Sequence, residues 1–233
     1  IYEPVTKYNT YVDGVDHLPS ILSQAFREAT SGSPGPVHLD VLGIMGQSLD
    51  ETKTDLEVVV EEQFSSYPAF RPAPEPERVK EAVSNLLAAK KPVIVAGGGV
   101  TASNAGAEVV KLAEILSLPV ATSLNGKGVI PEDHPLSIGV VGSYSRRCAN
   151  QIVSEADLVL FVGSHTGGQV TNYWKIPETD TATIQINIDP SEIGRSYPVK
   201  VPLLGDARVA LSLLIEDLGG KVVKRPEWIG RVH

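Results

Sequence analysis

After residue 76 the sequence alternates between short apolar runs and longer amphipathic stretches. The apolar runs are rich in valine and isoleucine, which is typical of strands buried inside a parallel sheet. The expected strands cover residues 93–96, 118–122, 157–163, 183–189 and 199–205. The stretches between them repeat apolar residues every three or four positions, which predicts helices over residues 76–89, 103–116, 144–154 and 206–218.

Strands that alternate with helices of this length form right-handed crossover units on a parallel sheet. We therefore predict an α/β domain over residues 76–219, with a doubly wound, Rossmann-like sheet of five or six strands. Residues 220–233 are expected to begin a linker toward a third domain.

The first part of the chain gives one helix, over residues 18–32, and one apolar strand, over residues 36–41. We expect no strand before them, and a single helix with a single strand buries too little surface to become ordered. Residues 1–44 are therefore interpreted as the C-terminal remnant of another α/β domain, and residues 45–75 as a linker that ends in several prolines. The alternative is that strand 36–41 pairs with the edge of the second sheet.

Composition narrows the classes of partner. The 233 residues carry a net charge of −8, without the basic patch that nucleic-acid binding requires. No apolar run approaches the length of a membrane span, so we expect neither nucleic acid nor membrane as a partner. One cysteine excludes an internal disulfide and a cysteine-based zinc cluster, and favours a reducing compartment, the cytoplasm.

Ligands of doubly wound sheets bind beyond the carboxyl ends of the strands, where the strand order reverses. Small, hydroxylic or polar residues follow each expected strand, and this rim suits a flat nucleotide that carries phosphate. The candidate residues are Gly97, Gly98 and Gly99; Thr122, Ser123 and Leu124; Ser164 and His165; Asp189, Glu192 and Ile193; and Asp206 and Ala207.

Several of these residues have a second interpretation. The glycines of residues 97–99 can simply make a turn, and Asp206 can be the N-cap of the last helix. Residues 97–102 also match the G-x-G-x-x-A fingerprint of nicotinamide sites, but no acidic residue ends the next strand to hold a ribose. Asp189 could hold one instead, and His165 is either a cofactor contact or an ordinary loop residue.

Motifs of catalysis are absent from the sequence. It has no nucleophile elbow with a Ser-His-Asp order, no H-E-x-x-H, no C-x-x-C and no P-loop. We therefore assign no catalytic residue and no metal ligand, and expect a binding rim without a catalytic centre of its own.

A series of segments resembles the thiamine diphosphate-dependent enzymes of the acetolactate synthase group. "SGSPGPVHLDV" resembles the end of their pyrimidine-binding domain. The segments that resemble landmarks of their central domain are, in order, "KKPVIVAGGGV", "LPVATSLNGKGVIPEDHPLSIGVVG", "ANQIVSEADLVLFVGS", "INIDPSEIGR" and "LLGDA". The resemblance covers nearly the whole chain and implies a three-domain enzyme, of which this chain holds the end of the first domain and all of the second.

In that family the catalytic glutamate lies in the first domain, and the site for Mg²⁺ and the diphosphate lies in the third. The resemblance thus implies that this chain alone is not catalytic, while the intact enzyme decarboxylates a 2-oxo acid and joins the product to a second carbonyl compound. It also implies a homo-oligomer, a dimer or tetramer, that the central domain braces.

The central domain of the family holds FAD, ADP or nothing. Carried over by position, the resemblance adds Gly142 and Ser143 to the candidate cofactor contacts given above. Acetolactate synthases have arginines where this chain has His165 and Gln169. The alternative function is a free-standing module that binds NAD or another adenine nucleotide, or a sirtuin-like NAD-dependent enzyme.

Overall fold

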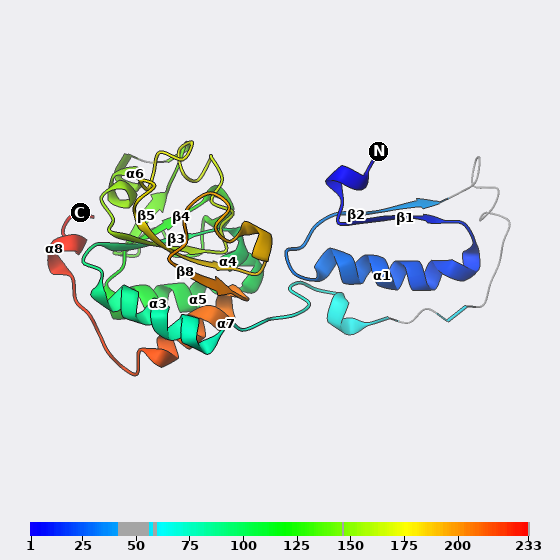
Figure 1. Cartoon of the computed structure of the whole chain (residues 1–233), viewed down its shortest axis with the longest axis horizontal. Coiled ribbons are helices and arrows are strands. Elements are labelled where there is room, and N and C mark those ends of the chain that lie inside the picture. The colour runs from blue at the N-terminus through cyan, green and yellow to red at the C-terminus, as the bar shows by residue number, and fades with distance from the viewer. Residues whose placement is uncertain (42–55, 58–59, 146, 233) are drawn as a thin grey trace. The chain divides into compact units, whose positions relative to one another are not determined.

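The computed structural model describes residues 1–41, 56–57, 60–145 and 147–232. The chain forms two compact units, residues 1–70 and residues 71–233, which are described separately (Figure 1).

The first unit contains two parallel strands and one helix. Strand β1 (Tyr8–Val12) pairs with β2 (Val37–Val41), and helix α1 (Leu18–Thr30) connects them and packs on both. The expectation of a helix and strand without a preceding partner strand was wrong, because β1, "YNTYV", has two adjacent polar residues at its centre and lacks an apolar run. The strands form a two-stranded sheet separate from the larger one, so the alternative pairing of strand 36–41 is also wrong. Helix α1 ends two residues before the predicted end at residue 32, and Gly32 follows it with a φ of +61°.

The second unit is built on six parallel strands in the order β5-β4-β3-β6-β7-β8. The bounds are β3 (Pro92–Ala96), β4 (Val120–Thr122), β5 (Ser137–Val140), β6 (Leu158–Val162), β7 (Ala182–Asn187) and β8 (Val201–Leu204). The predicted doubly wound sheet is confirmed. Strand β5 was missed, because four residues that include Gly139 give no clear apolar pattern.

Helices cover both faces of this sheet (Figure 1). On one face α3 (Pro76–Ala88), α5 (Gly106–Leu116) and α7 (Ala207–Asp217) form a single apolar core with the strands. On the other face the core contains α6 (Arg147–Ser154) and Trp228 of the short helix α8 (Pro226–Ile229). Because both faces are covered, every residue of β3 and β6 is buried, which explains their unbroken apolar sequences.

The predicted helix over residues 103–116 corresponds to α5, and a short helix before it, α4 (Gly98–Ser103), was not predicted. Helix α4 ends where Asn104 adopts a left-handed conformation with a φ of +53°, and α5 starts at Gly106. Asparagine tolerates this conformation better than most residues, so it can end one helix just before the next begins.

Residues 220–232, expected to begin a linker, pack on the second unit. The guanidinium of the buried Arg225 donates to the backbone carbonyl oxygens of Leu86, Ala89 and Leu116, at the C-terminal ends of α3 and α5. Trp228 Nε1 donates to the carbonyl oxygen of Pro92 at the start of β3, over 2.9 Å. Burial lowers the pKa of Arg225 from its ordinary value. None of the helices in the described parts of the chain is both long and apolar enough to cross a membrane.

Candidate functional site at the carboxyl ends of the strands

The strand order reverses between β3 and β6. The chain runs outward from β3 through β4 to β5 and then returns to the other side of β3 as β6. The loops after β3 and β6 therefore meet at the topological switch point, where ligands of such sheets bind.

The glycines at this point pack backbone against backbone. A Cβ atom added to Gly97 would lie 2.2 Å from the carbonyl oxygen of Gly163, and one added to Gly99 would lie 2.7 Å from Gly163 Cα. The N–H groups of Gly97 and Gly99 donate to the carbonyl oxygens of Val162 and Gly163, over 2.8 and 2.9 Å. Two amides expected to face a phosphate are thus bonded within the protein, and the glycines are required by the close approach of two loops.

Three further predicted residues lie at the end of β4. Thr122 is buried, and the Ser123 hydroxyl accepts a hydrogen bond from the N–H of Gly126, which closes a tight turn. Leu124 is 49% exposed. Gly98 lies next to this turn, since a Cβ atom added to it would be 3.1 Å from Asn125 Cβ.

The loops after β5 and β6 are joined at Gly142 and Ser143. The N–H of Ser143 donates to the carbonyl oxygen of Gln169 over 2.8 Å. Gly142 has a φ of +104°, and a Cβ atom added to it would lie 1.8 Å from the same oxygen. Only glycine fits here, so the family-derived Gly142 and Ser143 have a structural role in holding the two loops together.

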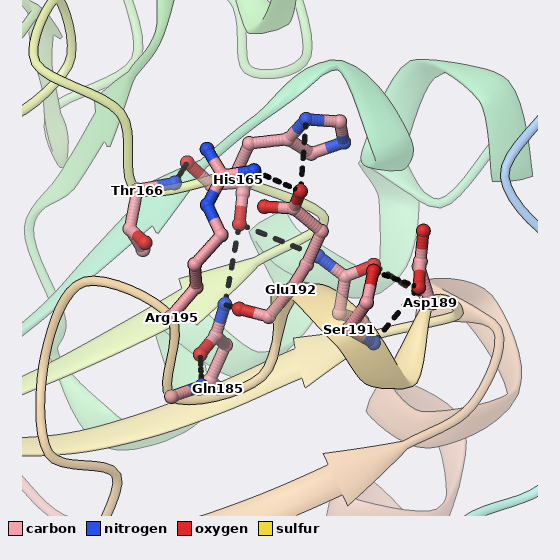
Figure 2. A network of polar contacts seen from close by, with 10 residues as sticks. His165, Thr166, Gln185, Asp189, Ser191, Glu192 and Arg195 are labelled. Atoms are coloured by element: carbon pink, nitrogen blue, oxygen red, sulfur yellow. Dashed lines mark hydrogen bonds and ion pairs between the residues drawn. The ribbon is translucent and has the colours of Figure 1, made fainter. Parts of the chain in front are cut away.

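A polar network occupies the rim beyond β6 and β7 (Figure 2). Glu192 is only 6% exposed, and its Oε1 accepts a hydrogen bond from Arg195 Nη1 over 2.5 Å. His165 Nδ1 lies 3.9 Å from the same oxygen. Glu192 Oε2 is buried and has no hydrogen-bond partner in the described part of the chain. Figure 2 shows the three side chains directed toward one another, which places a carboxylate between two nitrogen-bearing groups.

Gln185, on β7, holds the turn that carries Glu192. Its Nε2 donates to the carbonyl oxygen of Glu192, and its Oε1 accepts from the N–H of Gly194, each over 2.9 Å. The half-buried Ile193 lies between these two backbone groups. Nothing in the sequence pattern pointed to Gln185, because within a predicted strand it looks like any polar residue.

Ser164, Thr166 and Asp189 complete the network. Asp189 Oδ1 accepts from the N–H and the hydroxyl of Ser191, while the carbonyl oxygen of Ser164 accepts from Asn187 Nδ2 over 3.4 Å. Thr166 is 1% exposed, has a φ of +48°, and its hydroxyl has no partner among the described residues. The predicted Ser164, His165, Asp189 and Glu192 are therefore brought together at one place.

Asp206, in contrast, is bonded within the fold. Its carboxylate accepts from the N–H of Val209, as the predicted N-cap of α7. It also accepts from the Ser103 hydroxyl over 2.6 Å and from Arg71 Nη1 over 3.1 Å. Asp206 is 2% exposed and Ala207 behind it is 6% exposed, so these bonds leave the carboxylate little capacity for a ligand.

This arrangement presents an acceptor for hydroxyl groups, Glu192 Oε2, beside nitrogen-bearing side chains of the kind that contact anions, Arg195 and His165. Among the described residues no three His, Cys, Asp or Glu side chains are grouped to hold a metal ion.

The comparison with known families identifies the second unit. The family model of the thiamine pyrophosphate enzyme, central domain, matches residues 79–214, more than half of the chain. The chain belongs to the thiamine pyrophosphate enzymes. Its sheet, its switch point and its rim are thus those of the central domain of these enzymes.

Two similar proteins and one solved structure carry the names of enzymes. The chain is 34% identical, over its whole length, to the "Probable acetolactate synthase large subunit" of Methanocaldococcus jannaschii, and spans 39% of that protein. It is 32% identical to a glyoxylate carboligase of Escherichia coli, with 98% of this chain and 38% of the relative covered. A solved structure from Mycobacterium smegmatis, described as that of a thiamin diphosphate-dependent enzyme, matches 97% of this chain and 41% of its own, with a TM-score of 0.73 and 29% identity.

The chain therefore spans about two-fifths of the length of these thiamine pyrophosphate enzymes. The resemblance noted in the sequence is confirmed. The alternative of a free-standing NAD-binding module or a sirtuin-like enzyme finds no support in these matches.

Proposed function

We propose that this chain is the central part of a thiamine diphosphate-dependent enzyme of the acetolactate synthase type. The intact enzyme decarboxylates a small 2-oxo acid and joins the product to a second carbonyl compound. The observation that carries this proposal is the family match over residues 79–214, together with relatives named acetolactate synthase or glyoxylate carboligase that align over nearly the whole chain. The proposed enzyme is cytoplasmic and a homo-oligomer, a dimer or tetramer, braced by this domain.

Thiamine diphosphate and Mg²⁺ are assigned to parts of the intact enzyme other than this chain. The described residues offer no group of acidic side chains for Mg²⁺, and the most buried candidate, Asp206, is bonded to Arg71 and Ser103. Thiamine diphosphate supplies the electron sink for decarboxylation when bound. The residues of this chain contribute position and stability rather than proton transfer at the reacting atoms.

The second part of the proposal is an adenine nucleotide, FAD or ADP, at the rim. Two buried oxygens there lack partners in the described part of the chain, Glu192 Oε2 and Thr166 Oγ1. Leaving such groups unpaired is unfavourable, and ribose hydroxyls are suitable donors for a carboxylate. Arg195, of which the side chain is 54% exposed, and His165 can face a phosphate. These residues fit an adenosine that carries few phosphates. The fit to FAD is weaker, because this chain has His165 and Gln169 where acetolactate synthases have arginines.

We expect ADP or FAD to raise the midpoint of thermal unfolding of the chain, and thiamine diphosphate to leave it unchanged. A ligand at 100 times its dissociation constant stabilises the folded state by about 2.7 kcal/mol. For a domain of this size that corresponds to a shift of about 5–10 °C. The measurement is thermal unfolding with FAD, ADP, NAD or thiamine diphosphate, followed by circular dichroism.

The matched variants for this measurement are Glu192→Gln and Glu216→Gln. Glu192→Gln removes the buried charge at the rim and should reduce the shift with ADP, whereas Glu216 is exposed on α7 and its replacement should not. A shift with thiamine diphosphate alone would contradict the assignment of the rim to a nucleotide.

For the intact enzyme we expect activity that requires both thiamine diphosphate and Mg²⁺. Treatment with a chelator followed by dialysis should abolish decarboxylation of pyruvate or a related 2-oxo acid, and addition of both cofactors should restore it. Decarboxylation by the isolated 233-residue chain would contradict the proposal that its residues carry no catalytic centre.

A further inference from the structure

The loop after β6 contains a left-handed turn made by three consecutive residues. Asn172, Tyr173 and Trp174 have φ angles of +48°, +57° and +58°. This region of backbone conformation is unfavourable for residues that carry a Cβ atom, and for aromatic residues in particular. Such conformations persist only where the surrounding structure enforces them, and they concentrate at functional sites.

The surrounding structure does enforce this turn. Thr171 is fully buried, its hydroxyl donates to the carbonyl oxygen of Gly167 over 3.0 Å, and it accepts from the N–H of Trp174 over 2.9 Å. The N–H of Tyr173 donates to the carbonyl oxygen of Gly168 over 2.6 Å. The orientation of both aromatic residues is therefore fixed by the backbone.

The fixed turn exposes two large rings. Tyr173 is 67% and Trp174 is 52% exposed, whereas Trp228, the other tryptophan of the chain, is 3% exposed. Both rings lie beside Gly168, because a Cβ atom added to Gly168 would be 3.4 Å from Trp174 Cη2 and 3.6 Å from Tyr173 Cδ1. A strained backbone and two exposed aromatic rings are both unfavourable for the stability of the chain. A loop that only connected two strands would need neither of them.

The rings lie on the loop that leaves the switch point. Gly163 starts this loop against the glycines after β3, and Gln169 joins it to the loop after β5. Other large apolar side chains are exposed on the same edge of the sheet, Leu124 after β4 and Tyr144 after β5. The loops at the edge that carries the polar network of Glu192 thus also expose Tyr144, Tyr173 and Trp174.

We propose that Trp174, with Tyr173 beside it, is a stacking platform for the flat ring of the nucleotide at the rim. This inference rests on the nucleotide part of the proposed function. Aromatic side chains stack on heterocycles through their faces, with little loss of side-chain freedom, since tryptophan has only two rotatable side-chain bonds. A ring already held in place loses less freedom on binding than a mobile one. Because every base presents such a face, the platform accepts adenine and isoalloxazine alike.

The test uses the full 233-residue chain, which has two tryptophans. Substituting one of them at a time distinguishes their fluorescence. The emission of Trp174 is the difference between the spectra of the wild type and Trp174→Phe. The probes are ADP, adenosine, which carries the ring without phosphate, and ribose 5-phosphate, which lacks the ring. Affinities are measured by calorimetry for the wild type, Trp174→Ala, Trp174→Phe and, as the control, Trp228→Phe.

We expect ADP and adenosine to quench the emission of Trp174 in a saturable manner, and ribose 5-phosphate to leave it unchanged. Trp174→Ala should weaken ADP binding about tenfold or more, the range that stacked bases lose on such truncation. Trp174→Phe keeps a ring and should retain most of the affinity, and Trp228→Phe should bind as the wild type does.

Other results overturn the platform in distinguishable ways. If ADP binds Trp174→Ala as tightly as the wild type, and does not quench the emission of Trp174 in the wild type, the platform is wrong. The proposed nucleotide site then still stands. If neither calorimetry nor thermal unfolding detects any adenine nucleotide on the wild type, both fail. If the emission of Trp174 changes with protein concentration and not with nucleotide, the rings belong to a contact between copies of the chain, and the platform is wrong.

Discussion

Replacing Arg225 by methionine lowers the free energy of unfolding of the second unit by about 3 kcal/mol, the scale on which hydrogen bonds to a buried charged group act. The guanidinium donates to carbonyl oxygens at the C-terminal ends of α3 and α5. Carbonyl oxygens at a helix end have no hydrogen-bond partner within their own helix. Methionine keeps the apolar part of the side chain and removes all of these donors. Urea unfolding followed by the emission of the buried Trp228 reports on this unit.

The matched control for Arg225 is Lys224→Met, because Lys224 is the adjacent basic residue and is exposed. Its replacement should change the free energy of unfolding by less than about 0.5 kcal/mol, as surface substitutions usually do. Equal unfolding midpoints for Arg225→Met and Lys224→Met would show that water satisfies the helix-end carbonyls and that Arg225 does not anchor residues 220–232.

Replacing Asp206 by alanine is the second change with a large expected effect, a loss of about 3 kcal/mol of unfolding free energy. It removes the N-cap of α7 and leaves the Ser103 hydroxyl and the N–H of Val209 without their acceptor. It also removes the partner of Arg71, but the Arg71 side chain is 38% exposed and water can replace part of this interaction. The same urea titration measures the loss.

Two variants separate the contributions at Asp206. Asp206→Asn keeps a good N-cap and removes the charge, so it should cost clearly less than Asp206→Ala. Asp217→Ala removes an exposed carboxylate from the other end of α7, where the helix dipole disfavours negative charge, and should be neutral or slightly stabilising. If Asp206→Ala were no more destabilising than Asp217→Ala, the contacts of Asp206 with Arg71 and Ser103 would contribute nothing to stability.

The fold of the second unit could be predicted because its strands are buried on both faces. Burial makes the residues of β3 and β6 continuously apolar, and the helices between strands show one apolar face. Strands β1 and β5 escaped prediction for the opposite reason. Asn9 and Thr10 lie in the middle of β1, and Ser137 and Gly139 interrupt β5, so neither strand has the composition of a buried run.

The candidate site could be predicted only as a set of loops. Ser164, His165, Asp189 and Glu192 do meet at the rim, because the carboxyl ends of parallel strands share one edge. Gln185 and Arg195 were missed, since nothing local distinguishes a polar residue that orients a turn from one that faces water. Arg71 and Ser103 were missed because they meet Asp206 across 135 and 103 positions of the chain.

By itself the sequence determined the class of the fold and the family of enzymes, and it pointed to the edge of the sheet where we propose a ligand site, because periodicity, strand ends and motif order are local properties. Only the tertiary structure decided what each polar or glycine residue does there. Gly97 and Gly99 lie too close to Gly163 for side chains, and the acceptor positions of Asp206 are taken. Glu192 Oε2, in contrast, has no partner in the part of the chain that the structure describes. These roles depend on contacts between residues that lie far apart in the sequence. A local sequence pattern does not show which of these residues come close together.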